Sequence, residues 1–139
     1  MSNKQTVMIV EDDLDFAEIL KDTFDSSEEF EVVNVWNSID AFSIAFLNAA
    51  LKQDWLPDLI VADLLSGEAV RHDSLTALLE LRAEGFMFAV LLMSGLNLGA
   101  AEKIARKQGA KNFEVLSKSS KLDSKIIIDH ALKSVRELN

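Results

Sequence analysis

Acidic side chains directly follow two apolar runs of this sequence. Asp12 and Asp13 come just after the run Thr6 to Val10, and Asp63 ends a second run. If folding brings these three carboxylates together, their repulsion calls for a counter-charge, and Mg²⁺ prefers oxygen ligands such as carboxylates, phosphates and water. The same ion would neutralise an incoming phosphoryl group and leave Asp63 as the nucleophile. The three aspartates therefore predict a magnesium-dependent phosphoryl-transfer site.

A hydroxyl and an ammonium group would complete such a site, because phosphoryl transfer depends mainly on positioning and charge compensation. Ser94 and Lys118 can supply them, and the small residue Gly95 would let a phosphate approach the backbone closely. Each also has a simpler structural interpretation. Ser94 could be a turn residue, and Lys118 a solvated loop lysine with Lys121 as the alternative site cation. Asp13 could serve only as a helix N-cap.

Short β-branched runs alternate with longer segments of helical period, a pattern typical of repeated βα units. The expected strands are Thr6–Val10, Phe30–Trp36, Leu59–Ala62, Met87–Met93 and Asn112–Leu116. The expected helices are Leu14–Phe24, a segment from Ser38 to about Lys52, Ser74–Arg82, a stripe from Ala100 that stops at Gly109, and Leu122–Leu138. In the first helix the inward stripe is expected to consist of Leu14, Ala17, Leu20 and Phe24.

Five βα units predict an α/β fold, an open, doubly wound parallel sheet with right-handed crossovers. Ligands of such sheets bind outside the carboxyl ends of the strands. The residues at those ends are Glu11-Asp12-Asp13, Asp63, Ser94 and the region of Lys118. The elements are therefore expected to bring the chemically useful side chains to one edge of one sheet.

Length and composition narrow the class of protein. The 139 residues suit one domain, residues 1–139, and leave no room for a second folded unit, so output would pass through a partner protein. No cysteine is present, which excludes disulfides and thiolate metal sites and suits a cytoplasmic location. No run has the length of a membrane span or the form of a signal peptide. The net charge of -9 disfavours direct nucleic-acid binding.

The ordered motifs resemble those of the receiver domains of response regulators, over essentially the whole chain. The motifs are the acidic pair after the first strand, Pro57-Asp58-Leu59-Ile60-Val61-Ala62-Asp63, Met93-Ser94-Gly95 and Gly109-Ala110. The resemblance implies a flavodoxin-like (βα)5 fold with strand order 2-1-3-4-5.

The resemblance also implies roles for individual residues. Asp63 would be the phosphoacceptor, and Asp12, Asp13, Asp63 and the backbone carbonyl of Leu65 would hold Mg²⁺. Ser94 would be the switch hydroxyl, and Lys118 would contact the phosphate. The only catalysis expected is self-catalysed phosphorylation and dephosphorylation.

Partners follow from the same resemblance. The phosphoryl donor would be a sensor histidine kinase or a histidine phosphotransfer protein. The output partner would be a protein that the sequence does not identify, and phosphorylation could promote a homodimer.

The chain departs from the family pattern in three places. The loop Leu64–Glu68 lacks the usual Met-Pro pair, and Lys118 is followed by Ser119 where the family usually has a cis-bonded proline that helps to fix the lysine. The chain between Gly109-Ala110 and Lys118 is also about two residues longer than usual. Phe113 and Val115 therefore compete for the switch-aromatic position, and Phe113 would need a strand bulge or extension before Lys118.

The triplet Ile126-Ile127-Ile128 cannot face inward as a whole, because successive helical residues point about 100° apart. The outward residue is either an ordinary exposed apolar side chain or part of a partner surface on the last two helices and the fifth strand. His72 and His130 stand apart from other metal-ligating types and are expected to be surface or partly packed histidines.

Three other functions remain open at this stage. The chain could be a receiver-like adaptor that binds partners without phosphorylation. It could be a small phosphatase of the haloacid-dehalogenase type, with Asp13-Leu14-Asp15 supplying the nucleophile and acid; phosphate would then be carried by Asp13 and not by Asp63. A flavin-binding protein of the same fold fits least, because its first loop should offer hydroxyls and amides where this loop offers carboxylates.

Overall fold

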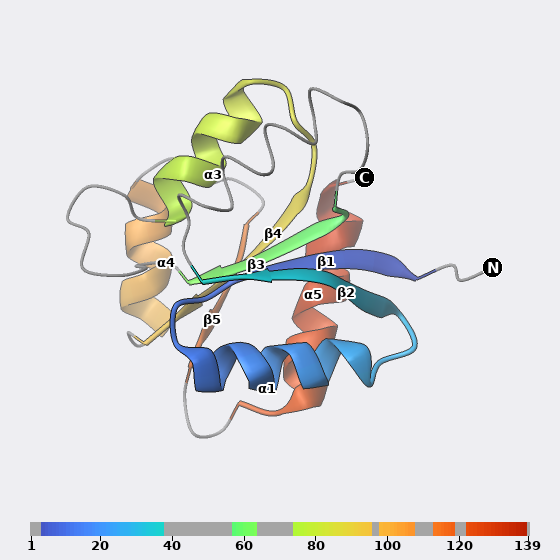
Figure 1. Cartoon of the computed structure of the whole chain (residues 1–139). Helices are drawn as coiled ribbons and strands as arrows, with labels where there is room; N and C mark the ends of the chain where they lie inside the picture. The colour runs from blue at the N-terminus through green and yellow to red at the C-terminus, as the bar shows by residue number, and fades with distance from the viewer. Residues whose placement is uncertain are drawn as a thin grey trace.

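A computed structural model describes residues 4–37, 57–63, 74–95, 98–107, 113–118 and 122–138 (Figure 1). Within these residues the strands are β1 (Gln5–Val10), β2 (Phe30–Trp36), β3 (Leu59–Asp63), β4 (Ala89–Ser94) and β5 (Glu114–Ser117). The helices are α1 (Leu14–Asp25), α3 (Ser74–Ala83), α4 (Leu98–Lys107) and α5 (Ser124–Leu138). The helix expected from Ser38 to about Lys52 lies outside the described residues.

The strands form one parallel sheet in the order β2-β1-β3-β4-β5, which confirms the predicted α/β architecture and its strand order. The side chains of β4 are all buried, as are those of β3 before its last residue, Asp63. This explains the nearly uniform apolar sequence of both strands, because a central parallel strand is covered on both faces.

Side chains of the sheet alternate between two hydrophobic clusters, one on each face. Met8, Val10 and Ile60 pack towards α3, whereas Val7 and Ile9 pack towards α1 and α5. Figure 1 shows the same layers, with α1 and α5 covering one face of the sheet and α3 and α4 the other. Two packed layers around the sheet give it a rigid edge on which a site can be built.

The inward stripe of α1 is shifted relative to the expectation. Ala17, Leu20 and Phe24 are buried, but Leu14 is 70% exposed, so its predicted burial was wrong. At about 100° per residue, Leu14 points roughly a quarter turn away from the mean direction of the other three. The stripe widens on its opposite side, where Phe16 packs partly against the core.

Several element boundaries also differ from the expectation by about two residues. β4 begins at Ala89 and not at Met87, whose side chain is 63% exposed ahead of the buried run. β5 runs from Glu114 to Ser117, and α5 begins at Ser124 and not at Leu122. In α5 the carboxylate of Asp123 accepts the amide of Ile126 at 2.9 Å, so a helix N-cap sets the start.

The amino ends of β1 and β3 are joined by a reciprocal set of hydrogen bonds. The amide and the hydroxyl of Thr6 donate to Asp58 Oδ2 at 2.8 and 3.1 Å, and the Asp58 amide donates to the Thr6 carbonyl at 3.0 Å. This Thr6–Asp58 clip fixes the register of two central strands at the edge opposite their carboxyl ends. Among the described helices, none is long and apolar enough to cross a membrane.

Candidate functional site

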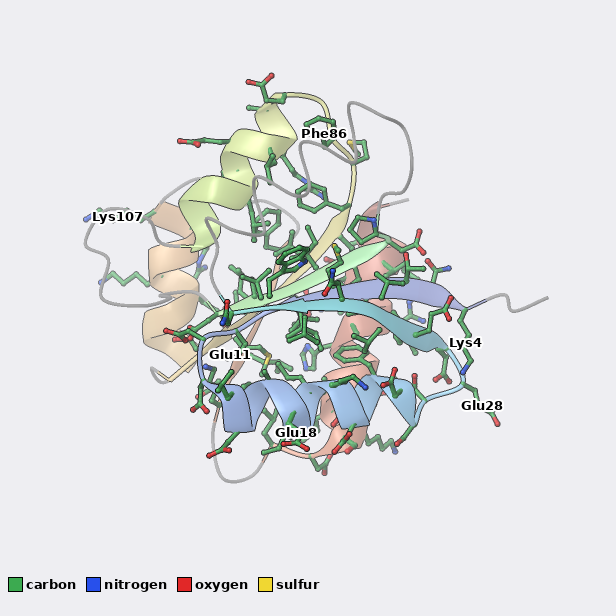
Figure 2. All side chains as sticks on the ribbon, in the orientation of Figure 1. Lys4, Glu11, Glu18, Glu28, Phe86 and Lys107 are labelled. Carbon is green, nitrogen blue, oxygen red and sulfur yellow. The ribbon has the colours of Figure 1, made fainter. Side chains whose placement is uncertain are left out.

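Four strands deliver polar side chains to the carboxyl edge of the sheet. Glu11 follows β1, Asp63 ends β3, Ser94 ends β4 and Lys118 follows β5. The Lys118 amide donates to the Ser94 carbonyl at 2.7 Å, which continues the β4–β5 pairing up to the lysine. Figure 2 shows Glu11 at this edge, beside the start of α1. The expected gathering of residues therefore occurs.

Three carboxylates form an acidic cluster at this edge, namely those of Glu11, Asp12 and Asp63. One oxygen from each lies within 4.8 Å of the others, a spacing that a single cation could bridge. Glu11 is 1% exposed, and Asp63 has a side chain that is 12% exposed. Of the three aspartates that the sequence suggested, the structure brings Asp12 and Asp63 into this cluster, and Glu11 is the third member.

Asp13 occupies a different position, at the start of α1. Its Oδ1 accepts the amides of Asp15 at 3.1 Å and Phe16 at 3.2 Å, which are orphan donors of the first helical turn. The helix-capping interpretation of Asp13 is therefore confirmed. The carboxylate that the sequence placed with the metal ligands is engaged in holding the helix.

Glu11 was missed because the first strand appeared to end at Val10. The Glu11 amide donates to the Trp36 carbonyl at 2.9 Å, so the pairing of β1 with β2 continues by one residue. Its side chain turns into the protein, and Oε2 accepts the Asp13 amide at 3.2 Å. The strong preference of Asp for N-caps was the one sequence signal that pointed to Glu11 and Asp12 as the acidic pair, but it did not decide the choice.

Lys118 lies against the acidic cluster. Its Nζ is 2.6 Å from Glu11 Oε1 and 3.1 Å from Asp63 Oδ2, and its side chain is 17% exposed. The ring centroid of Phe16 is 4.7 Å from the same nitrogen. Lys118 thus partly neutralises the cluster and lies beside Asp63; Lys121, the alternative site cation, lies outside the described residues.

The electrostatics of the cluster favour proton binding at one carboxyl and charge at the lysine. Burial raises the pKa of Glu11 to about 7, and the charge of Asp63 adds to this, although Lys118 and the Asp13 amide favour the ionised form. Burial also disfavours charge on Lys118, but Glu11 and Asp63 outweigh it and raise the lysine pKa above its ordinary value. A perturbed carboxyl beside a paired lysine is typical of functional sites.

The remaining predicted switch residues occupy β4 and β5. Ser94 is buried, with 2% exposure, next to the end of β3. Val115 pairs with Leu92 in regular register, and the described β4–β5 ladder contains no bulge before Lys118. Phe113 lies just before β5, with its ring centroid 5.0 Å from the Arg82 guanidinium. Leu65 lies outside the described residues.

The isoleucine triplet of α5 divides as its helical spacing predicts. Ile126 is 37% exposed, Ile127 is buried and Ile128 is half-buried. His130 is partly packed, with Nδ1 3.0 Å from Glu114 Oε1, which agrees with the packing predicted for it. His72 lies outside the described residues.

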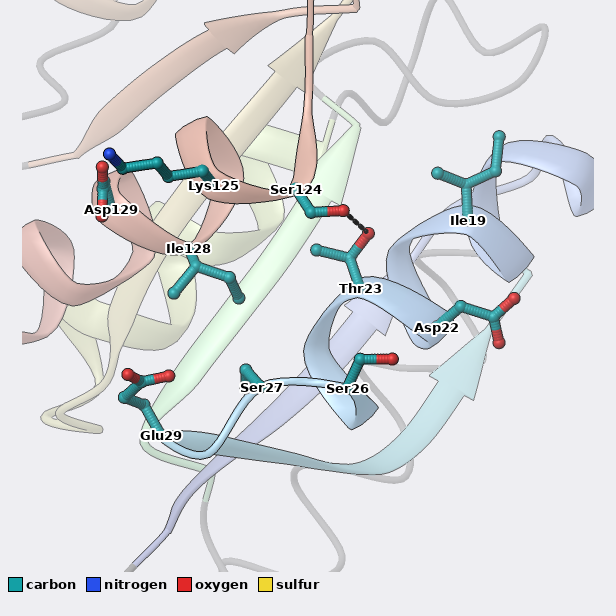
Figure 3. Close-up of a pocket in the computed structure, with 10 residues that line it drawn as sticks. All are labelled: Ile19, Asp22, Thr23, Ser26, Ser27, Glu29, Ser124, Lys125, Ile128 and Asp129. Atoms are coloured by element: carbon teal, nitrogen blue, oxygen red, sulfur yellow. Dashed lines mark hydrogen bonds between the residues drawn. The ribbon is translucent and has the colours of Figure 1, made fainter.

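A groove of about 630 Å³ lies between α1 and α5, away from the acidic cluster (Figure 3). The hydroxyls of Thr23 and Ser124 face each other across it at 3.5 Å, and Ile19 and Ile128 contribute apolar walls. No member of the acidic cluster lines this groove. It is therefore a feature separate from the site at the sheet edge.

Comparison with known proteins identifies the architecture. No protein-family model and no curated protein matches the sequence. Solved structures do match over nearly the whole chain. The signal receiver domain of the putative response regulator NarL from Mycobacterium tuberculosis has a TM-score of 0.74 and 21% identity, covering 96% of this chain and 97% of that one.

Two further solved structures match similar shares of the chain. The receiver domain of a Francisella response regulator has a TM-score of 0.70 and 19% identity, covering 96% of this chain and 98% of its own. CheY from Borrelia burgdorferi, in a complex with CheX, BeF₃ and Mg²⁺, has a TM-score of 0.71 and 20% identity, covering 92% of this chain and 87% of its own. The chain therefore has the fold of response regulator receiver domains.

Proposed function

We propose that this chain is a phosphoacceptor signalling switch that receives a phosphoryl group on Asp63 from a sensor histidine kinase or a histidine phosphotransfer protein. The observation that carries this proposal is the position of the Asp63 carboxylate. It ends a central strand, lies within 4.8 Å of the oxygens of Glu11 and Asp12, and is held by Lys118 at 3.1 Å. A nucleophile, an acidic cluster and a cation are thereby assembled on one rigid edge.

The acidic cluster suits Mg²⁺ by the chemistry of its donors. Glu11, Asp12 and Asp63 all offer carboxylate oxygens, the hard ligands that Mg²⁺ prefers. Burial, with a smaller contribution from the charge of Asp63, raises the pKa of Glu11 to about 7, so a cation that offsets the charge of this carboxylate would be favoured there. We therefore assign the metal ligands to these three residues, with Glu11 in place of Asp13; the Leu65 carbonyl stays an expectation. Bound Mg²⁺ would neutralise charge on the phosphoryl group.

Asp63, Lys118 and Ser94 have separate roles in the transfer of the phosphoryl group. An Asp63 oxygen forms the new bond to phosphorus while the bond from phosphorus to the donor's imidazole nitrogen breaks, and the imidazole keeps the electron pair. Lys118, already 3.1 Å from Asp63, compensates the charge of the transferred oxygens. Ser94 lies buried at the adjacent strand end and can donate its hydroxyl to a phosphate oxygen.

Phosphorylation would act as a switch through these same contacts. A phosphate on Asp63 adds oxygens to which the Ser94 hydroxyl and the Lys118 ammonium can bond, so it favours any arrangement of the strand ends that brings these groups closer to it. Val115, three residues before Lys118 in regular register, would occupy the switch-aromatic position. The output surface would include Ile126 on α5, and the homodimer is a further proposed consequence.

Incubation with acetyl phosphate and Mg²⁺, followed by intact mass measurement, tests the proposal. Wild type should gain one phosphoryl group, and Asp63→Asn should gain none because it lacks the nucleophile. Asp13→Asn is the matched control, since it makes the same chemical change at a neighbouring carboxylate outside the cluster. Modification of Asp63→Asn at the wild-type level would exclude the assignment.

Two alternatives make different predictions in the same experiment. A receiver-like adaptor would leave the wild type unmodified, and the ion pairs of Lys118 with Glu11 and Asp63 lend it some support because they already offset part of the cluster's charge. A phosphatase that uses Asp13 would lose its phosphoryl group in Asp13→Asn. The engagement of Asp13 Oδ1 by two helix amides disfavours this reading.

A further inference from the structure

Phe16 is an aromatic residue in the first turn of α1, and it contacts the lysine of the candidate site. Its ring centroid lies 4.7 Å from Lys118 Nζ, within the range of a cation–π interaction. The carboxylates of Glu11 and Asp63 approach the same nitrogen at 2.6 and 3.1 Å. The ammonium group is therefore held by two carboxyl groups and one aromatic ring, which come from three different parts of the chain.

We propose that Phe16 is a positioning residue that holds the Lys118 ammonium over the acidic cluster, a proposal that rests on the phosphoacceptor function of that site. The ring acts through Lys118 and makes no contact with the phosphoryl group itself. Its role is to keep the ammonium close to Asp63 when Glu11 is engaged elsewhere, for example by a cation.

The local structure supplies a reason for such a residue. Lys118 follows the last residue of β5, and Ser119 comes next in the sequence, so no proline ring restricts the backbone there. The Lys118 backbone is fixed on its amide side by the bond to the Ser94 carbonyl at 2.7 Å. The long side chain still needs contacts of its own, because fixing its ammonium costs substantial rotamer entropy that those contacts must offset.

Phe16 is itself well placed to provide that restraint. Its amide donates to Asp13 Oδ1 at 3.2 Å, so the N-cap of α1 fixes the turn that carries the ring. The ring is half-buried and packs against the hydrophobic cluster below α1. A ring that is anchored on one side and faces an ammonium on the other can attract the cation and shield it from water.

NMR of the metal-free, unphosphorylated protein tests the contact directly. Protons on the ε-carbon of Lys118 should show a ring-current shift in wild type that disappears in Phe16→Leu, which keeps apolar bulk but has no π-face. Phe16→Tyr should retain the shift. Leu14→Ala is the matched control, because it alters an exposed residue of the same helical turn. An unchanged Lys118 signal in Phe16→Leu would overturn the proposal.

Phosphorylation rates with acetyl phosphate and Mg²⁺ test the consequence. Phe16→Leu should react roughly fivefold more slowly than wild type, as expected from loss of one partly desolvated cation–π contact, and Phe16→Tyr should restore the rate. Circular dichroism confirms that each variant is folded. An equal loss of rate in Leu14→Ala would refute a specific role for the ring. If wild type takes no phosphoryl group, the proposed function fails, while the NMR comparison still decides the role of Phe16.

Discussion

At the scale of single residues, the site depends on a buried carboxyl group that carries an unfavourable charge. Glu11 is 1% exposed and has only one cation, Lys118, among the described residues around it, while Asp63 adds a second negative charge. A charge in this position raises the free energy of the folded state unless a proton or a cation binds. The folded protein therefore gains stability when the cluster is neutralised.

The pH dependence of stability should reveal Glu11. Its pKa rises from an ordinary value of 4.5 to about 7 on folding. Between these values the folded protein binds a proton that the unfolded chain has lost, so the free energy of unfolding should fall as pH rises through this window. At about 1.4 kcal/mol per pKa unit, the loss approaches roughly 3 kcal/mol in metal-free buffer.

Urea unfolding at pH 5 and pH 8 measures this effect, with Glu11→Gln as the comparison. The variant cannot ionise, so its stability relative to wild type should increase between the two pH values. Lys118 does not alter the sign, because its pKa is raised and the loss of its charge falls at alkaline pH. Parallel pH profiles for the two proteins would contradict the assignment of the titration to Glu11.

The sequence was least informative about which individual residues form the site. Asp63 could be identified because it ends an apolar run, and Lys118 because the order of motifs placed it near the last strand. The choice among Glu11, Asp12 and Asp13 depends on where β1 stops and α1 starts, and three consecutive acidic residues give no periodic signal for that boundary. Only the backbone hydrogen bonds resolve it.

At the scale of elements, the start of α1 separates the carboxylate that caps the helix from those of the acidic cluster. Asp13 satisfies two helix amides, and the same turn carries Phe16 towards Lys118. The elements themselves follow from the sequence, since every expected strand occurs in its predicted place in the sheet. Their ends do not, because local details decide them: the Asp123 cap sets the start of α5, and Met87 is apolar yet exposed ahead of β4.

Substitutions at Asp13 and Asp12 should therefore have opposite effects on stability and on Mg²⁺ affinity. Asp13→Ala removes the N-cap and should lower the free energy of unfolding by about 1 kcal/mol, with little effect on Mg²⁺ affinity. Asp12→Asn removes a charge from the cluster and should weaken Mg²⁺ binding by about tenfold or more, without loss of stability in metal-free buffer. Urea unfolding and Mg²⁺ titration followed by NMR distinguish them. Equal weakening of Mg²⁺ binding by Asp13→Asn would place Asp13 among the ligands after all.

At the scale of the whole molecule, the site exists only when the sheet is complete. Its groups come from β1, β3, β4 and β5, which are distant in sequence and adjacent only in the folded order. An unfolded chain cannot hold them together, so a ligand of the site binds the folded state alone and must stabilise it. Ligand binding and the stability of the whole sheet are therefore linked, even though the ligand makes no contact with the opposite edge of the sheet.

Thermal unfolding with Mg²⁺ and beryllofluoride, a phosphoryl mimic, tests this coupling. At a ligand concentration about one hundred times its Kd, wild type should gain about 2.7 kcal/mol of stability and a higher Tm. Asp63→Asn should lose the part of this stabilisation that depends on beryllofluoride.

Thr6→Val removes the hydroxyl of the Thr6–Asp58 clip at the opposite edge and should lower the basal stability by about 1 kcal/mol. Because the clip is remote from the acidic cluster, the ligand-induced gain should be the same in Thr6→Val as in wild type. A reduced gain there would mean that the amino edge takes part in the site.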